Sequence, residues 1–212
     1  MYKEPKTGLW CREDTLDEYV VKEQRCYDLL LDFAKGKVVM DIGGNIGAFA
    51  YSAIKHGAKS VISFELDPDN ITVFTKQNLD QVKLIKGAIA SHNGTATLYL
   101  NKGKNKGMHS LQAIGGRETI QVKAYPFKKA LTKYSPDLIK IDIEGGEFDL
   151  DFKNMPEFIQ GIAIEIHLNH GNNREMAPAL IKTLRQQFPS VLKTPRITEK
   201  NWTTYFIGMR GD

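Results

Sequence analysis

The chain of 212 residues carries 29 Lys and Arg against 25 Asp and Glu, a formal net charge of +4, and 42% of its residues are hydrophobic. This length fits one domain, and the composition is sufficient for a buried core. The mild basic excess permits an anionic partner without requiring one, because nucleic-acid-binding proteins usually concentrate their positive charge on one face.

The N-terminal stretch MYKEPKTGLW lacks the apolar core of a signal peptide, and no apolar run approaches the roughly 18 residues of a membrane span. We therefore expect no membrane partner. Cys11 and Cys26 are the only cysteines, and nothing else in the sequence indicates a disulfide scaffold. Both are expected to be reduced thiols, which favours a cytoplasmic protein.

The first part of the chain predicts helices alternating with buried strands. Thr15 and Glu18 have the spacing of a capping box, which predicts a helix within an N-terminal segment (residues 1–36) packed on the domain. An apolar strand over 37–42 then leads through a glycine turn into a helix that ends near Gly57. A second strand covers 61–66, and a third helix is expected from Asp67 and Pro68 to about Leu79.

The second part predicts a third strand over 82–90 and then an inserted hairpin with a lysine-rich loop (residues 95–125). Apolar strands follow over 137–143 and 161–167, each with a helical segment after it, and an edge strand over 203–209. Residues 1–212 are therefore predicted to form a single α/β domain. Its doubly wound, mostly parallel seven-stranded sheet would have helices on both faces and an antiparallel edge strand near the C-terminus.

Polar side chains recur where the predicted strands end, at the edge where such sheets bind ligands. These are Asp41, Glu65, Asp142, Glu144, Glu165 and His167. The turn with Gly43, Gly44 and Gly47 lets a ligand approach the backbone closely. Glu65, at the end of the next strand, is in the right place to bind both ribose hydroxyls of a nucleoside.

The charge of this edge favours S-adenosylmethionine over a nicotinamide dinucleotide. Asp41, Asp142 and Glu144 would repel a pyrophosphate, whereas they would stabilise a sulfonium and an ammonium group. The turn also reads GGNIG and not G-x-G-x-x-G.

Three stretches resemble known methyltransferases. Residues 38–70 (VVMDIGGNIGAFAYSAIKHGAKSVISFELDPDN) resemble the cofactor-binding half of class I methyltransferases, whose fold is Rossmann-like. The segments LIKIDIEGGE (138–147) and LIKGAIASHNGTATLYL (84–100) are similar to the FkbM family. The resemblance covers about residues 38–167. It implies a cofactor set around the methionine, ribose and adenine groups: Asp41, Gly43, Gly44, Asn45, Gly47, Glu65, Leu66, Ala88 and Asp142.

The sequence departs from the class I pattern at the adenine site. Many class I enzymes have an acidic residue after the third strand, whereas this chain has Ala88, Ile89 and Ala90. Adenine is therefore expected to be held by the backbone of Gly87 and Ala88 and by apolar contacts.

Transfer of a methyl group to an alcohol requires a base within hydrogen-bond reach of the hydroxyl. Asp142, Glu144 and His167 are the candidates for this catalytic role. Glu147 is expected only to charge the N-terminus of the helix after the fourth strand. Asp142, Glu165 and His167 together are an alternative ligand set for a divalent metal, but their spacing in the sequence assigns none.

The leading hypothesis is O-methylation of a hydroxyl on a sugar, glycan or other small molecule, which the resemblance implies. A second is methylation of a nucleic acid, with Lys102, Lys104 and Lys106 as a phosphate clamp. A third is a non-catalytic module that binds the cofactor for a partner protein. The sequence leaves the oligomeric state open.

Overall fold

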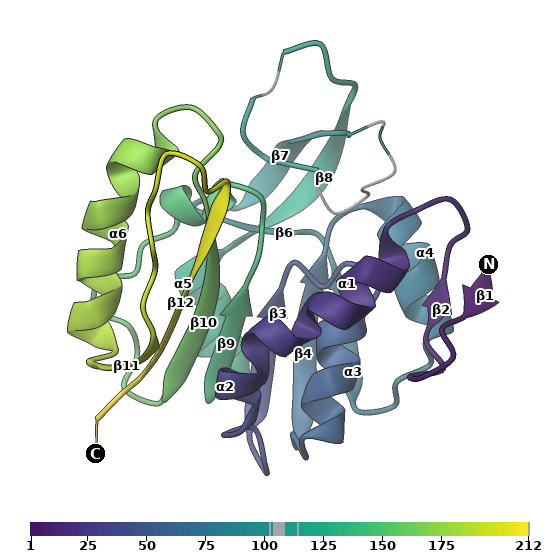
Figure 1. The fold of residues 1–212 in the computed structure, drawn as a ribbon, viewed down its shortest axis with the longest axis horizontal. Coiled ribbons are helices and arrows are strands. Elements are labelled where there is room, and N and C mark those ends of the chain that lie inside the picture. The colour runs from purple at the N-terminus through teal and green to yellow at the C-terminus, as the bar shows by residue number, and fades with distance from the viewer. Residues whose placement is uncertain (102, 104–108, 114, 212) are drawn as a thin grey trace.

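The computed structural model describes residues 1–101, 103, 109–113 and 115–211. A seven-stranded sheet in the order β11-β12-β10-β9-β3-β4-β5 runs through the molecule (Figure 1). Its parallel strands are β3 (Val38–Ile42), β4 (Ser60–Glu65), β5 (Val82–Lys86), β9 (Leu138–Ile141) and β10 (Gly161–His167). The predicted doubly wound α/β fold is confirmed.

The C-terminal strands complete the sheet in an order that corrects the sequence prediction. β12 (Thr203–Met209) pairs antiparallel with β10, and β11 (Ser190–Lys193) pairs antiparallel with β12. β11 is therefore the edge strand, and the prediction of an edge position for 203–209 was wrong. The apolar run from Phe206 to Met209 is buried, as expected for a strand with neighbours on both sides, whereas β11 alternates between exposed and half-buried positions.

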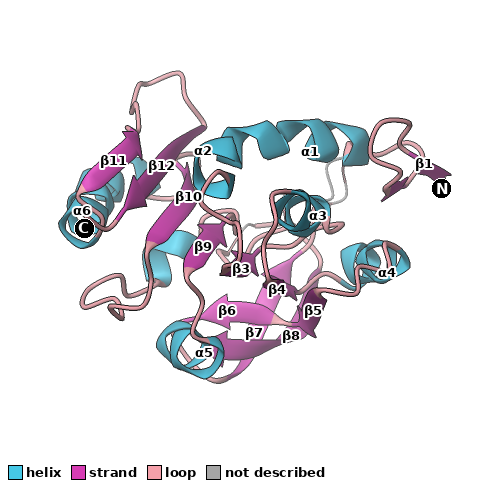
Figure 2. Ribbon diagram, turned by 90° about the horizontal axis from the view of Figure 1, so that it is seen from below, coloured by secondary structure: helices cyan, strands magenta, loops and turns pink. Residues whose placement is uncertain are grey.

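Helices cover both faces of the sheet (Figure 2). One face carries α1 (Asp17–Glu23), the 3₁₀ turn η1 (Gln24–Tyr27), α2 (Asp28–Leu31), α3 (Ala48–Lys55) and α4 (Pro68–Lys76). The other carries α5 (Phe127–Tyr134) and α6 (Asn173–Gln187). Successive side chains of a strand point to opposite faces, so Val39 packs with α2 and α3, and Met40 packs with α5 and α6.

The N-terminal segment begins with a two-stranded sheet of β1 (Tyr2–Lys3) and β2 (Trp10–Cys11). The predicted capping box was wrong: the N-cap of α1 is Leu16, and Thr15 Oγ1 accepts the backbone N–H of Asp17 over 3.3 Å, not that of Glu18. Arg12 also holds the start of α1, because its guanidinium donates two hydrogen bonds of 2.8 and 2.9 Å to the buried carboxylate of Asp17. Glu18 pairs with Lys22 on the exposed side of the helix.

The predicted strand over 82–90 is broken at Gly87. Its φ of +145° disfavours any other residue, and a Cβ there would lie 2.6 Å from the carbonyl oxygen of Lys123. The chain therefore leaves the main sheet after β5. It continues as β6 (Ala88–Ala90), which forms a separate three-stranded sheet with β8 (Thr119–Pro126) and β7 (Gly94–Tyr99).

The segment after β9 also differs from expectation, because only a four-residue 3₁₀ turn, η2 (Gly146–Asp149), follows where a helix was predicted. Cys11 and Cys26 are free thiols, in agreement with the sequence. None of the helices in the described ranges has the length and apolar character of a membrane span.

Candidate active site

Strand register gathers the polar residues of the site on the face that carries α2 and α3. Asp41 of β3 stands opposite Ser63 of β4 and Lys140 of β9. Ser63 Oγ donates to Asp41 Oδ2 over 2.7 Å, and Lys140 Nζ lies 3.3 Å from Asp41 Oδ1. Lys140 Nζ also donates to the Gly43 carbonyl over 2.6 Å. These buried contacts support the glycine turn from beneath.

Residues 43–47 form a turn whose shape depends on glycine. Gly43 has a φ of +86°, and a Cβ there would lie 1.8 Å from the carbonyl oxygen of Asp142. A Cβ on Gly44 would lie 2.2 Å from Ser63 Oγ. Gly43, Gly44 and Asn45 line the cavity at the end of the sheet, whereas Asp41 and Gly47 do not belong to its lining.

Glu65 closes the turn from the neighbouring strand. Its Oε2 accepts the backbone N–H of Asn45 over 2.6 Å, and its Oε1 accepts those of Leu66 and Asp67 over 3.0 and 2.8 Å. Burial is the largest influence on this carboxyl, and although the three N–H groups oppose it, the pKa of Glu65 is raised to about 7. Glu65, the residue predicted to bind the ribose, therefore lines the cavity, and the backbone hydrogen bonds fix its position.

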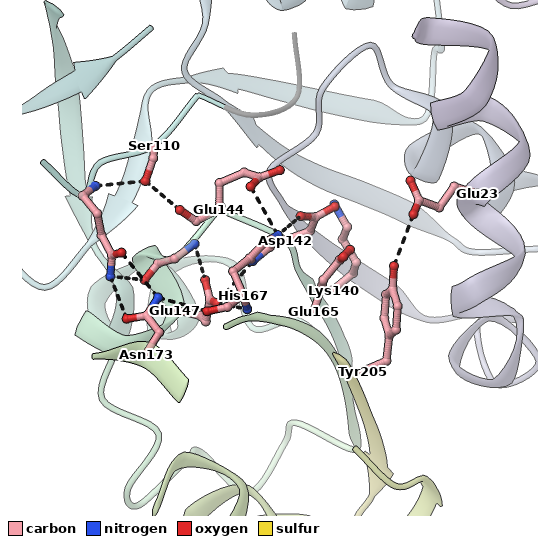
Figure 3. A network of polar contacts seen from close by, with 12 residues as sticks. Glu23, Ser110, Lys140, Asp142, Glu144, Glu147, Glu165, His167, Asn173 and Tyr205 are labelled. Carbon is pink, nitrogen blue, oxygen red and sulfur yellow. Dashed lines mark hydrogen bonds and ion pairs between the residues drawn. The ribbon is translucent and has the colours of Figure 1, made fainter. Parts of the chain in front are cut away.

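A second polar group surrounds His167 at the end of β10 (Figure 3). Glu147, fully buried, accepts the backbone N–H of His167 over 2.6 Å and lies 3.2 Å from its Nδ1. His167 Nε2 lies 3.7 Å from Asp142 Oδ1 and 3.5 Å from Glu144 Oε2. The structure thus brings the three predicted catalytic residues together.

Glu147 has the role predicted for it and a second one: its Oε2 accepts the backbone N–H of Gly145 at the start of η2 over 2.9 Å, while its Oε1 orients His167. Burial lowers the pKa of His167, but Glu147 and the other nearby carboxylates outweigh it and raise that pKa well above its usual value. Burial chiefly raises the pKa of Glu144 to about 8. His167 and Glu144 can therefore both bind a proton at neutral pH.

Two tyrosines lie near Asp142: Tyr27 lines the cavity, and Tyr205 contacts Glu23, which also lines it. The Tyr27 hydroxyl lies 3.3 Å from both Asp142 Oδ2 and Glu165 Oε2, and the Tyr205 hydroxyl donates to Glu23 over 3.3 Å. Burial is also the main reason that the pKa of Glu165 is raised, to about 7. Sequence reasoning missed both tyrosines, and it missed Lys140, although a lysine inside the apolar strand Leu138–Ile141 is a signal for a buried ion pair.

The glycine turn with Glu65 and the polar group around His167 face the same cavity, which has a volume of about 340 Å³. Its inner wall contains Glu65, Leu66, Ala88, Asp142, Glu144 and His167. Exposed apolar side chains lie around it: Trp202 is 68% exposed, Tyr19 61% and Leu16 42%. A ligand can therefore enter past aromatic side chains and reach buried carboxylates.

Residues 109–112, which lead back from the loop of the inserted hairpin, lie along one side of this cavity. His109 Nε2 lies 3.2 Å from Asp67 Oδ2, and Ser110 Oγ donates to the Glu144 carbonyl over 2.6 Å. Gln112 Nε2 donates to the Gly145 carbonyl over 2.8 Å. The predicted phosphate clamp of Lys102, Lys104 and Lys106 lies outside the described residues.

The family model for the methyltransferase FkbM domain matches residues 41–188. The chain belongs to this family, as its signature segments predicted. It is a methyltransferase enzyme, and S-adenosylmethionine is its methyl donor. A comparison with curated proteins gave no match.

Several solved structures share the fold. The methyltransferase FkbM from Methylobacillus flagellatus KT is 16% identical with a TM-score of 0.54, and the match covers 98% of this chain and 48% of that one. Precorrin-8w decarboxylase from Methanobacterium thermoautotrophicum is 13% identical, with coverages of 100% and 97% and a TM-score of 0.50. Fibrillarin from Aeropyrum pernix, solved with natively bound S-adenosylmethionine, is 11% identical, with coverages of 88% and 74% and a TM-score of 0.50.

The cavity has the chemistry that this cofactor needs. Within the described chain, Asn45 Oδ1 and Gln24 Oε1 are buried without a hydrogen-bond partner, and both residues line the cavity. They can accept hydrogen bonds from the ammonium or ribose groups of the donor. The surplus of carboxylates over cations suits a ligand with a sulfonium and an ammonium group.

Proposed function

We propose that this enzyme methylates a hydroxyl group of a sugar, glycan or other small molecule. The observation that carries the proposal is the group of Asp142, Glu144 and His167 at the inner end of a cavity that also contains Glu65 and the glycine turn. A hydroxyl must lose its proton during methylation, and a buried carboxyl with a pKa near neutrality is matched to that task.

The residues divide into two roles. Glu65 and the backbone of residues 43–45 bind the donor, with the side chains of Asn45 and Leu66 and the backbone of Ala88 beside it. When bound, S-adenosylmethionine supplies an electrophilic methyl group on sulfur. Asp41 and Gly47 act indirectly, by holding the turn, and Asp142 extends from the donor side to the acceptor side.

Glu144 is the base in this proposal. With the donor bound, the acceptor oxygen would take the methyl group and leave a neutral thioether, and the Glu144 carboxylate would take the hydroxyl proton. His167, held by Glu147, keeps the carboxylates of Asp142 and Glu144 in place. Most of the catalytic effect is expected from positioning, because the reaction is an in-line displacement.

A screen with a radiolabelled methyl donor tests the proposal. The acceptors are monosaccharides, oligosaccharides and small hydroxylated aromatics, with RNA and DNA in parallel. We expect label on a small hydroxylated acceptor, in a bond stable to base as an ether is, and only a weak effect of salt. Label on nucleic acid alone, falling steeply as ionic strength rises, would contradict the proposal and favour the phosphate-clamp hypothesis.

A further inference from the structure

Three side chains beside the proposed base have the composition of a metal site. Asp142 follows β9, and Glu165 and His167 lie in the neighbouring strand β10. Each offers one ligand atom, and these atoms all lie within 4.8 Å of one another. Two carboxylates and one imidazole are ligands that divalent transition metals accept.

The orientation of His167 is an independent indication. The side chain is 3% exposed, and Glu147 lies against its Nδ1, which leaves Nε2 facing the carboxylates of Asp142 and Glu144. Nε2 is engaged in ion pairs with these two carboxylates, and its distances to them exceed those of short hydrogen bonds. A carboxylate on one imidazole nitrogen typically fixes the other nitrogen toward a metal.

The distances around Nε2 suit a shared ion better than direct hydrogen bonds. Asp142 Oδ1 and Glu144 Oε2 lie 3.7 and 3.5 Å away, whereas charge-assisted hydrogen bonds span about 2.7–2.9 Å. Two ligands about 2.0–2.2 Å from a tetrahedral metal are separated by about 3.3–3.6 Å. Within the ligand set, the 3.7 Å between His167 Nε2 and Asp142 Oδ1 is slightly longer than this separation, and the three ligand atoms lie within 4.8 Å of one another, so small side-chain shifts would place them around one ion.

The number of buried carboxylates also favours a bound cation. Lys140 is shared between Asp41 and Asp142, so His167 alone stands among the carboxylates of Glu144, Glu147 and Glu165. Such an excess of buried carboxylates is costly unless bound protons or a cation offset their charge. Asp142 is 31% exposed, which gives an ion a route from the cavity.

We infer that Asp142, Glu165 and His167 bind a divalent transition-metal cation, with Glu144 beside it. The cation replaces the proton on His167 Nε2. Its role rests on the proposed function: the ion holds the acceptor hydroxyl as a Lewis acid and makes its proton easier for Glu144 to remove.

Binding of Mn²⁺ to the full chain, followed by electron paramagnetic resonance of the free ion, tests the site without donor or acceptor. We expect one ion per chain, with affinity at least about tenfold weaker in Glu165→Gln and in His167→Gln, and about tenfold weaker in Glu147→Gln. Glu23→Gln is the matched control, because it removes a carboxylate of the same cavity outside the ligand set. Melting curves establish that each variant is folded.

The outcomes separate this site from the proposed function. No binding at millimolar Mn²⁺, or equal affinity in the folded Glu165→Gln variant and the parent, would overturn the metal site. Full methyl transfer after removal of metals with a chelator would overturn its catalytic role and leave the proposed function intact. Specific Mn²⁺ binding in an enzyme that methylates only nucleic acid would retain the site and remove the proposed acceptor class.

Discussion

Ser110 Oγ donates a 2.6 Å hydrogen bond to the carbonyl oxygen of Glu144 and thereby ties the inserted hairpin to the turn after β9. Glu144 has a φ of +50°, which is costly for a residue other than glycine. Ser110 is 1% exposed, so its hydroxyl acts as a fixed support. The insertion thus helps to hold the proposed base in its strained conformation.

Ser110→Ala is expected to lower kcat about tenfold or more with little change in donor affinity, because a misplaced base weakens the chemical step. The substitution removes two hydrogen bonds, one donated to the Glu144 carbonyl and one accepted from the backbone N–H of Gln112, and should also reduce the free energy of unfolding by about 1–3 kcal/mol. Steady-state kinetics and calorimetry with the donor measure the two effects. Thr97→Ala, which removes the acceptor of an exposed hydrogen bond in the same hairpin, serves as the control. Parental kinetics in Ser110→Ala would mean that the insertion does not position Glu144.

Lys140→Met should destabilise the fold more than any other substitution considered for this site. The side chain is 3% exposed and lies between Asp41 and Asp142, so its removal leaves Asp41 as a buried carboxylate without its cation. Breaking a buried ion pair in this way costs about 3–5 kcal/mol. Denaturant unfolding measures the loss, and Lys140→Met combined with Asp41→Asn should recover part of it. If the single variant is as stable as the parent, Lys140 does not hold the turn.

Glu65 predicts a dependence of stability on pH. Its pKa is about 7 in the folded protein against an ordinary value of 4.5, so the folded state binds this proton more tightly than the unfolded state. The stabilisation that comes from protonated Glu65 is complete below about pH 4.5 and is lost as pH rises through about 7. Over that range the free energy of unfolding should fall by at most about 1.4 kcal/mol per pH unit.

Glu65→Gln cannot titrate, so the difference in unfolding free energy between this variant and the parent should move in favour of the variant as pH rises through that window. Denaturant unfolding of both proteins over the range measures it. A difference that stays constant with pH would show that the three backbone N–H groups keep the pKa of Glu65 near its ordinary value. The same variant should bind S-adenosylmethionine more weakly than the parent, since an amide is a poorer acceptor for ribose hydroxyls.

The parts of the fold that sequence predicted well depend on local patterns. Strands Gly161–His167 and Thr203–Met209 have the predicted bounds, because each is a short segment dominated by β-branched, aromatic and other apolar residues. The break at Gly87 was missed because it depends on the close approach of Lys123, 36 positions further along the chain. The contact of Tyr27 with Glu165 spans 138 positions, and no local pattern encodes it. The candidate carboxylates could be predicted because they lie at strand ends. Their hydrogen-bond and ion-pair partners could be identified only from the folded structure.

Asp142 stands between Lys140, Tyr27 and His167. Asp142→Asn preserves the shape of the side chain and its ability to accept the Tyr27 hydroxyl, but removes the charge. We expect a folded protein that loses about 100-fold or more of its activity, since in the proposed function this carboxylate faces both the donor and the acceptor. Melting curves establish the fold. Weaker donor binding in calorimetry would assign Asp142 to the cofactor, whereas a lower kcat at unchanged donor affinity would assign it to the chemical step. A variant with parental values of both would exclude Asp142 from the site, and His167, together with Glu144, would then remain as the candidate catalytic group.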